Sequence, residues 1–174
     1  MPEISKRVLE LAKKVQVVFS DVDGIFTDNR VLEGAPYKAK WRNYYDGQGV
    51  SLLRAIGIRV CIISGEKDDS ARHIINTVEK WNNLPSSEKI PNDGGWYRVK
   101  LYTGMNGPQK GVAAEEWLKE IGVSFEQSAF MGNDLPDVPL LWRVALRAVP
   151  KSGESVVINI ADFVSIRPGG NGAF

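Results

Sequence analysis

The chain has 174 residues, of which 43% are hydrophobic and 25% are charged, and its formal net charge is +1. This profile is typical of a single globular domain with a sizeable core, here residues 1–174. The sequence holds no basic block, no interleaving of aromatic and basic residues and no run of membrane-spanning length, so we expect neither a nucleic-acid nor a membrane partner.

Cys61 is the only cysteine, which excludes an intrachain disulfide and favours a reducing compartment. The first residues lack the long apolar core of a signal peptide. Together these features predict a cytoplasmic protein.

Helical and strand patterns alternate along the chain. In the first third of the chain, the patterns predict a helix over 2–14 with Pro2 in its first turn, a strand from 17 that ends at Asp21, a β-hairpin over 30–45 around Gly34-Ala35-Pro36 and a helix over about 48–56. The middle is predicted to hold a strand over 59–63, a helix over 68–81, a polar loop over 82–96 and a strand over 98–102. The last third is predicted to hold a helix opened by Pro108 and closed by Gly122, a strand over 128–131, a final strand near 144–149 and a helix near 153–160.

This alternation predicts an α/β fold with a Rossmann-like, doubly wound parallel sheet and helices on both faces. The hairpin over about 30–45 is then a small insertion, and the chain is too short to hold a large cap domain besides the core. In such sheets ligands bind beyond the carboxyl ends of the strands.

Two carboxylates follow the first predicted strand. Asp21 and Asp23 stand two residues apart, so they leave the strand end on the same side, and Gly24 lets the backbone turn sharply. Paired carboxylates repel unless a cation or a shared proton lies between them, which indicates a divalent metal site or an acid–base pair. By itself this pattern also fits a helix cap or a solvated turn.

Two further strand ends carry polar signatures, Ser64-Gly65 and Gly132-Asn133-Asp134, and Lys110 opens the helix before the second of them. Since the carboxyl ends of parallel strands meet at one sheet edge, these groups are expected to converge. Paired carboxylates, a hydroxyl with a free amide, a cation and a second acidic cluster are suited to handling a phosphate with magnesium.

The order of these motifs resembles that of the haloacid dehalogenase superfamily, and the second aspartate matches its phosphatases. Further motifs resemble the branch that contains the 3-deoxy-D-manno-octulosonate 8-phosphate and nonulosonate 9-phosphate phosphatases. The segments that carry this resemblance are Asp21-Val-Asp23-Gly-Ile-Phe-Thr-Asp28, Tyr45-Asp46-Gly47-Gln48-Gly49, Gly132-Asn133-Asp134-Leu-Pro-Asp137 and the Gly-Gly-x-Gly-Ala tail. Residues 82–97 are longer than this branch usually has at that place.

The resemblance implies a phosphomonoester hydrolase that works through an aspartyl phosphate. Asp21 would attack phosphorus, and Asp23 would protonate the leaving alkoxide and then activate water. Lys110 would neutralise charge on the phosphoryl group. The further implied phosphate or substrate contacts are Ser64, the amides of Gly24 and Gly65, Thr27 and Glu66.

The resemblance also implies a magnesium cofactor. Its ligands would be the Asp21 carboxylate, the Asp23 backbone carbonyl and the Asn133 amide, while Asp134 and the supporting Asp137 would hold the metal's waters and the Lys110 ammonium. The branch often has Asp where this chain has Asn133, so the site has one negative charge fewer.

The substrate implied is a small sugar-acid phosphate, and Glu66 bears on which one. In the resembling branch, enzymes for the eight-carbon acid tend to carry Arg at this place and those for nine-carbon acids tend to carry Glu, so the resemblance implies a nine-carbon acid. A carboxylate just past the phosphate-binding turn accepts hydrogen bonds from sugar hydroxyls and repels a substrate carboxylate brought close. The alternative is that Glu66 pairs with Lys67 or Arg72 at a helix start. Capless relatives form tetramers through the hairpin, and we expect a homotetramer here.

Two other functions remain open at this stage. One is a phosphatase-like module without turnover that serves oligomerisation beside a cytidylyltransferase, against which the intact Asp21, Asp23, Ser64 and Lys110 argue. The other is a phosphomutase. The tail is expected to reach an active site, as it does in the resembling branch.

Overall fold

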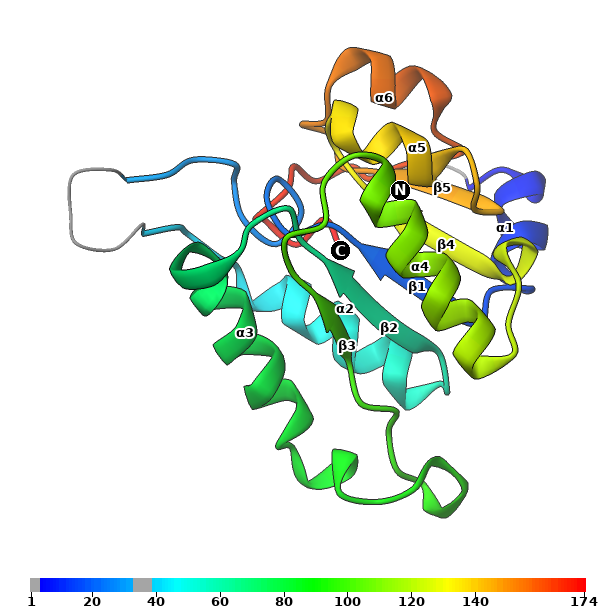
Figure 1. Cartoon of the computed structure of the whole chain (residues 1–174). Coiled ribbons are helices and arrows are strands. Elements are labelled where there is room, and N and C mark those ends of the chain that lie inside the picture. Colours follow the sequence, from blue (N-terminus) through cyan, green and yellow to red (C-terminus); the bar gives the residue numbers. More distant parts are fainter. Residues whose placement is uncertain (1–3, 33–38) are drawn as a thin grey trace.

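Six parallel strands form one open sheet in the computed structural model, which describes residues 4–32 and 39–174 (Figure 1). Over these residues the strand order is β3-β2-β1-β4-β5-β6, so the first strand lies in the middle and the chain winds outward from it in both directions. This confirms the predicted Rossmann-like α/β sheet, in which a ligand site forms where the winding reverses. In the same residues no helix has the length and apolar character needed to cross a membrane.

The strands are β1 (Val17–Ser20), β2 (Arg59–Ile63), β3 (Lys100–Tyr102), β4 (Ser128–Met131), β5 (Leu146–Val149) and β6 (Phe163–Val164). The helices are α1 (Lys6–Ala12), α2 (Tyr44–Ala55), α3 (Asp68–Asn82), α4 (Pro108–Ile121), α5 (Val138–Leu141) and α6 (Ser155–Ile160). Short 3₁₀ turns are η1 (Pro85–Ser87), η2 (Pro91–Asp93), η3 (Phe125–Gln127) and η4 (Leu135–Asp137).

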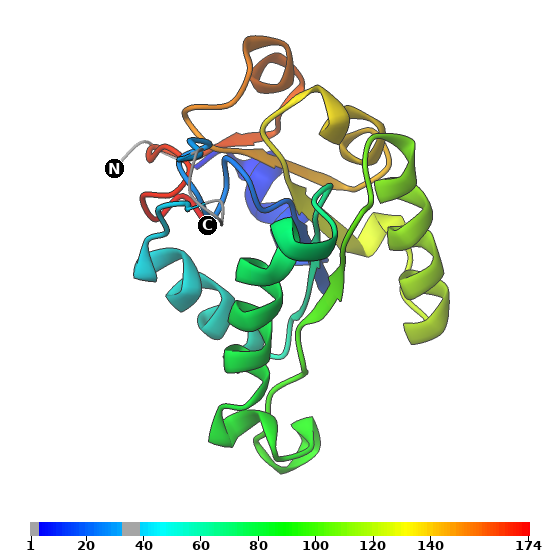
Figure 2. The ribbon, with the colours of Figure 1, turned by 60° about the vertical axis from the view of Figure 1, so that its left-hand side comes forward.

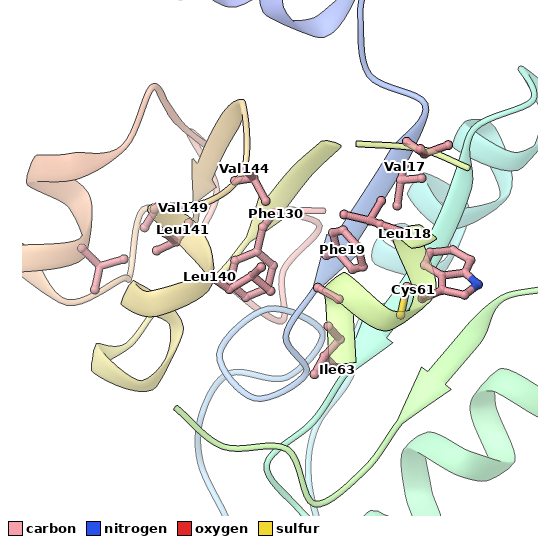
Figure 3. Close-up of a cluster of buried hydrophobic side chains, with 14 residues drawn as sticks. Val17, Phe19, Cys61, Ile63, Leu118, Phe130, Leu140, Leu141, Val144 and Val149 are labelled. Carbon is pink, nitrogen blue, oxygen red and sulfur yellow. The ribbon is translucent and has the colours of Figure 1, made fainter. Parts of the chain in front are cut away.

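Helices cover both faces of the sheet because alternate strand residues point to opposite sides. In β2, Cys61 and Ile63 join the core under α4, α5 and α6, whereas Val60 and Ile62 join the core under α2 and α3. Figure 3 shows the first of these cores, in which Phe19 from β1 belongs to one cluster with Leu118 from α4 and Leu140 from α5. Strands buried on both sides hold the polar strand ends in fixed positions.

Two predicted helix starts are wrong. The first helix begins at Lys6 instead of residue 2, because the Ser5 side chain caps it by accepting a hydrogen bond from the Val8 amide; Pro2 lies outside the described residues. The second helix begins at Tyr44 instead of about Gln48, because the Asn43 side chain caps it by accepting a hydrogen bond from the Tyr45 amide at 2.9 Å. Side-chain caps of this kind fix helix starts more firmly than apolar spacing does.

The strand near 144–149 is not the last strand. The chain continues through α6 into β6, which pairs with β5 through Ala148–Phe163 and Val149–Val164. A two-residue edge strand is too short to show an alternating pattern, and the four-residue α5 is too short to show a helical one. Both therefore escaped prediction.

The insertion after β1 consists of two arms, which Figure 1 shows leaving the body on the side of α3. Two isolated antiparallel bridges join the described parts of these arms, Thr27 with Arg42 and Leu32 with Ala39. The predicted turn at Gly34-Ala35-Pro36 lies outside the described residues. The far arm ends at Asn43, so Tyr44 and Tyr45 belong to α2 and not to the predicted hairpin.

The additional segment at 82–97 lies at the amino ends of the strands, opposite the edge that carries the polar motifs (Figures 1 and 2). Arg54, which is 1% exposed, donates hydrogen bonds to the carbonyls of Tyr97 and Trp81 and to the Ser87 hydroxyl. Burial, and then the charge of Arg98, lower the pKa of Arg54. The segment is thus fastened to α2 far from the polar strand ends and does not cover them.

The C-terminal tail packs against the loop that follows β1. The Gly170 amide donates to the Ile25 carbonyl at 2.7 Å, and the Phe174 ring packs on Phe26 with centroids 5.0 Å apart. The buried Asp46 carboxylate accepts the amides of Gly172 and Phe174 at 3.1 and 3.0 Å. Residues more than 120 positions apart in the sequence therefore hold one another in place.

We expect Gly170→Ala to loosen this contact. Gly170 has φ +68°, and an added Cβ would lie 2.5 Å from the Thr27 carbonyl carbon. The matched control is Gly122→Ala, which has the same φ but no atom within 4 Å of the added Cβ. The control should lose about 1–2 kcal/mol of unfolding free energy to backbone strain, and Gly170→Ala about 1–3 kcal/mol more to overpacking.

Urea unfolding measures both variants. Equal losses in the two would show that the tail does not press on the loop after β1.

Candidate active site

The carboxyl ends of three adjacent strands bring the predicted residues together. β1 leads to Asp21, β2 to Ser64 and β4 to Asn133, and the register pairs β1 directly with both neighbours. Between these strand ends lies a cavity of about 140 Å³. Its lining residues are Asp21, Asp23, Asn29, Gly65, Glu66, Asn106, Lys110, Asn133, Asp134, Pro136 and Asp137.

Lys110 connects the two acidic motifs. It lies in the first turn of α4, is 2% exposed, and places its Nζ 2.8 Å from Asp21 Oδ1 and 2.6 Å from Asp137 Oδ1. Burial opposes the ammonium, but the charges of Asp21 and Asp137 outweigh it and raise the pKa of Lys110. The lysine is therefore a fixed cation at the cavity wall.

The Asp21 carboxylate has more negative charge around it than one lysine balances. Burial first, and the charge of Asp137 second, raise the pKa of Asp21 from 3.8 to about 7, against the lowering effect of Lys110. A carboxyl in this position gains from a further cation, because an opposite charge nearby favours its ionised form.

Asp137 organises the loop after β4. Its second oxygen, Oδ2, accepts the Asn133 amide at 2.8 Å and the Asp134 amide at 3.1 Å, while Oδ1 accepts Lys110. Asp134 turns its own carboxylate to the Leu135 amide at 2.6 Å, which caps η4. Of the pair predicted to share the metal's waters and the Lys110 ammonium, Asp137 is the one that contacts Lys110.

The donor set suits a hard divalent cation. Asn133 Oδ1 is buried and has no hydrogen-bond partner among the described residues, and Asn133 lines the same cavity as Asp21. A buried acceptor without a donor calls for a ligand, and carboxylate and amide oxygens are those that magnesium prefers. Asp21 and Asn133 therefore fit the predicted metal site, with Asp134 at its rim.

Asp23 lies in the loop after β1, and its carboxylate accepts hydrogen bonds from the Thr27 hydroxyl and from the Lys40 ammonium. The Thr27 hydroxyl donates to Asp23 Oδ1 at 3.0 Å and accepts the Gly24 amide at 3.3 Å. Thr27 is thus placed to orient Asp23, and the Gly24 amide that was predicted to face a phosphate points to Thr27 here. No side chain fits at Gly24, because a Cβ there would overlap the Asn133 amide group.

Ser64 and Gly65 form the turn after β2. The Ser64 hydroxyl accepts the Glu66 amide at 3.1 Å, and Gly65 lines the cavity. Gly65 therefore borders the cavity in which the sequence predicts a phosphoryl group, whereas Ser64 is buried and is not among the residues that line it.

Lys40 is the residue that sequence reasoning missed. It comes from the far arm of the insertion, its side chain is 4% exposed, and its Nζ lies 2.8 Å from both oxygens of Asp23 and 2.7 Å from Glu66 Oε2. A lone lysine in an irregular arm carries no motif that would have pointed to it. Among the described residues Glu66 forms an ion pair with Lys40, whereas Arg72, one of the two partners predicted for Glu66, pairs with Asp69.

His73, whose side chain is 32% exposed, completes this second group, with Nδ1 3.8 Å from Glu66 Oε2. Ligand atoms of Asp23, Glu66 and His73 lie within 4.8 Å of one another. The ammonium of Lys40 already occupies the position between Asp23 and Glu66, so among the described residues the better metal site is the one at Asp21 and Asn133.

Comparisons with known proteins agree with this geometry. No family model matches the sequence. The 3-deoxy-D-manno-octulosonate 8-phosphate phosphatase of Salmonella typhi is 26% identical over 171 residues, which cover 98% of this chain and 80% of the relative. The crystal structure of the enzyme with the same name from Yersinia pestis is 27% identical, with a TM-score of 0.77 over 97% of this chain and 80% of that one.

A cobalt-bound phosphatase of this kind from Haemophilus influenzae is 26% identical, with a TM-score of 0.73 over 94% of this chain and 84% of that one. These likenesses confirm that the chain resembles the haloacid dehalogenase-like phosphatases in sequence and fold over nearly its whole length. They also confirm the predicted enzyme class, a phosphomonoester hydrolase.

Proposed function

We propose that this protein is a magnesium-dependent phosphatase that hydrolyses the phosphomonoester of a 3-deoxy sugar acid, either an octulosonate 8-phosphate or a nonulosonate 9-phosphate. One observation carries the proposal: Lys110 joins Asp21 and Asp137 across a cavity that also exposes Asp23, Gly65 and the rim of a cation site. The relatives named for the octulosonate phosphate support the substrate class.

In the proposed reaction, an oxygen of Asp21 forms a bond to phosphorus while the bond from phosphorus to the sugar oxygen breaks. Asp23 gives its proton to the departing oxygen, and in the second half it takes a proton from the water that attacks the aspartyl phosphate. The products are the free sugar acid and inorganic phosphate.

The remaining groups hold the phosphoryl oxygens. Lys110 neutralises charge there, and the Gly65 amide and Ser64 hydroxyl provide hydrogen bonds at the facing turn. Thr27 orients Asp23. Magnesium would be held by Asp21, Asn133 and the Asp23 carbonyl, with Asp134 holding its waters, and would supply positive charge that offsets the negative phosphate and carboxylates.

We propose in addition a cytoplasmic homotetramer. Large apolar side chains are exposed on the outer side of α2 and on the insertion arms: Leu32, Trp41, Tyr44, Leu52 and Ile56. An exposed set of this size is typical of an interface. Light scattering on the purified chain measures its mass, and a monomer would contradict this part of the proposal.

Phosphate release from p-nitrophenyl phosphate, measured with magnesium and with excess EDTA, tests the function. We expect turnover with magnesium and its loss in EDTA, because the uncompensated carboxylates repel the substrate. The same assay on the octulosonate and nonulosonate phosphates ranks the substrates. If none of these esters released phosphate, a non-catalytic module would be supported. A sugar bisphosphate product would support a phosphomutase.

A further inference from the structure

The Lys40 ammonium is shared between the two acidic groups that would meet the leaving part of the substrate. It donates hydrogen bonds to both oxygens of Asp23 at 2.8 Å and forms an ion pair with Glu66 Oε2 at 2.7 Å. Charge-assisted hydrogen bonds of this length are strong. Since Thr27 also donates to Asp23 Oδ1, both oxygens of Asp23 are occupied in this structure.

This arrangement does not suit the proposed role of Asp23. To protonate a leaving oxygen, Asp23 has to direct one of its oxygens at that atom within hydrogen-bond distance. An ammonium across both oxygens competes for that position. Lys40 therefore has to move off Asp23, at least in part, before the first chemical step.

A second hollow lies where the ammonium could move. Lys40 also lines a cavity of about 450 Å³ between the insertion arms, with Asp28, Arg30, Leu32 and Trp41 among its other walls. The smaller cavity, of about 140 Å³, has room for a phosphoryl group and little more. The leaving part of a larger substrate thus has space on the Lys40 side, where Arg30 is a second basic residue.

We propose that Lys40 is a substrate-binding residue that recognises the carboxylate of the sugar acid, and that this contact draws its ammonium off Asp23. This inference rests on the proposed phosphatase function and adds the residue that selects acids over neutral sugars. Glu66 remains the anchor of the lysine, so its carboxylate is balanced by a cation and does not simply repel an acid. A neutral sugar phosphate offers no anion on this side, and the ammonium then stays on Asp23.

The test compares 3-deoxy-D-manno-octulosonate 8-phosphate with glucose 6-phosphate, whose sugar part carries no carboxylate. In the unaltered protein, we expect the acid to have the higher kcat and the lower KM. In Lys40→Met, we expect KM for the acid to rise about 10- to 100-fold, the effect of losing a hydrogen bond to a charged group. The two kcat values should also become equal within about twofold, because no ammonium then remains to be displaced from Asp23.

Two variants serve as controls. Lys40→Arg keeps the charge and should keep most of the preference for the acid. Lys67→Met removes the same charge from the neighbouring turn, where Lys67 forms no ion pair with another described residue, and should keep the preference as well. Unchanged kinetic ratios in Lys40→Met, or the same change in Lys67→Met, would overturn the proposal.

Calorimetric titration with the free acid, 3-deoxy-D-manno-octulosonate, needs no turnover and separates the two proposals. We expect the free acid to bind about 10- to 100-fold more weakly to Lys40→Met than to the unaltered protein, with glucose as the neutral comparison. Equal affinity in both proteins would refute the role of Lys40 even if the enzyme is active. If no ester is hydrolysed, the phosphatase proposal fails, and this titration still decides the role of Lys40.

Discussion

Asp21→Asn is expected to lower kcat with p-nitrophenyl phosphate by about 10⁴-fold or more, the scale seen when a covalent nucleophile is removed. The amide cannot form the aspartyl phosphate, and none of the other groups near Lys110 can replace it. The fold should be kept, because a neutral amide avoids the cost of burying the carboxylate whose pKa is raised to about 7.

Asp69→Asn is the matched control for this variant, since Asp69 is exposed at the start of α3 and pairs with Arg72. It should retain nearly full activity. Circular dichroism and thermal unfolding check that both variants are folded. Phosphate release near the unaltered rate in Asp21→Asn would rule out the proposed intermediate.

Lys110→Met is expected to have the second-largest effect, and it acts on stability as well as on rate. The variant leaves Asp21 and Asp137 buried without their shared cation, which should cost about 3–5 kcal/mol of unfolding free energy in EDTA. Magnesium should restore part of this loss, because it binds beside the same carboxylates. The kcat should fall about 10²–10³-fold through lost charge stabilisation.

Lys119→Met provides the comparison on the same helix. Lys119 is exposed and pairs with Glu115 four residues away, so its loss should cost less than about 1 kcal/mol. Urea unfolding with and without magnesium measures both variants. If magnesium stabilised Lys110→Met no more than it stabilises Lys119→Met, the cation would not bind beside Asp21.

Much of this architecture could be predicted because its signals are local. The runs that became β1, β2 and β4 are short, apolar and closed by polar turns, and β2 and β4 were predicted to the residue. Parallel strands place their carboxyl ends at one edge, so the meeting of Asp21, Ser64 and Asn133 followed from topology and needed no knowledge of side-chain angles. The contact between Asp137 and Lys110 was implied only by the family resemblance.

The parts that escaped prediction depend on long-range contacts. Lys40 reaches Asp23 and Glu66 only because the insertion folds back over the sheet edge, and no spacing in the sequence encodes that return. The same holds for Arg54, a charged residue whose burial is determined by the carbonyls of a distant segment. Helix starts were missed where one capping side chain, such as Asn43, decides the boundary.

The contact between the C-terminal tail and the loop after β1 has a consequence for folding during biosynthesis. Ribosomes make the loop carrying Asp23 early, yet Gly170 and Phe174, which hold its neighbours Ile25 and Phe26, are added almost 150 residues later. Domains fold as their chain emerges, and contacts between distant residues form last. A nascent chain can therefore assemble its sheet during translation while the loop that carries Asp23 stays unsupported, and we expect this loop to be held in place only after residue 174 has cleared the exit tunnel.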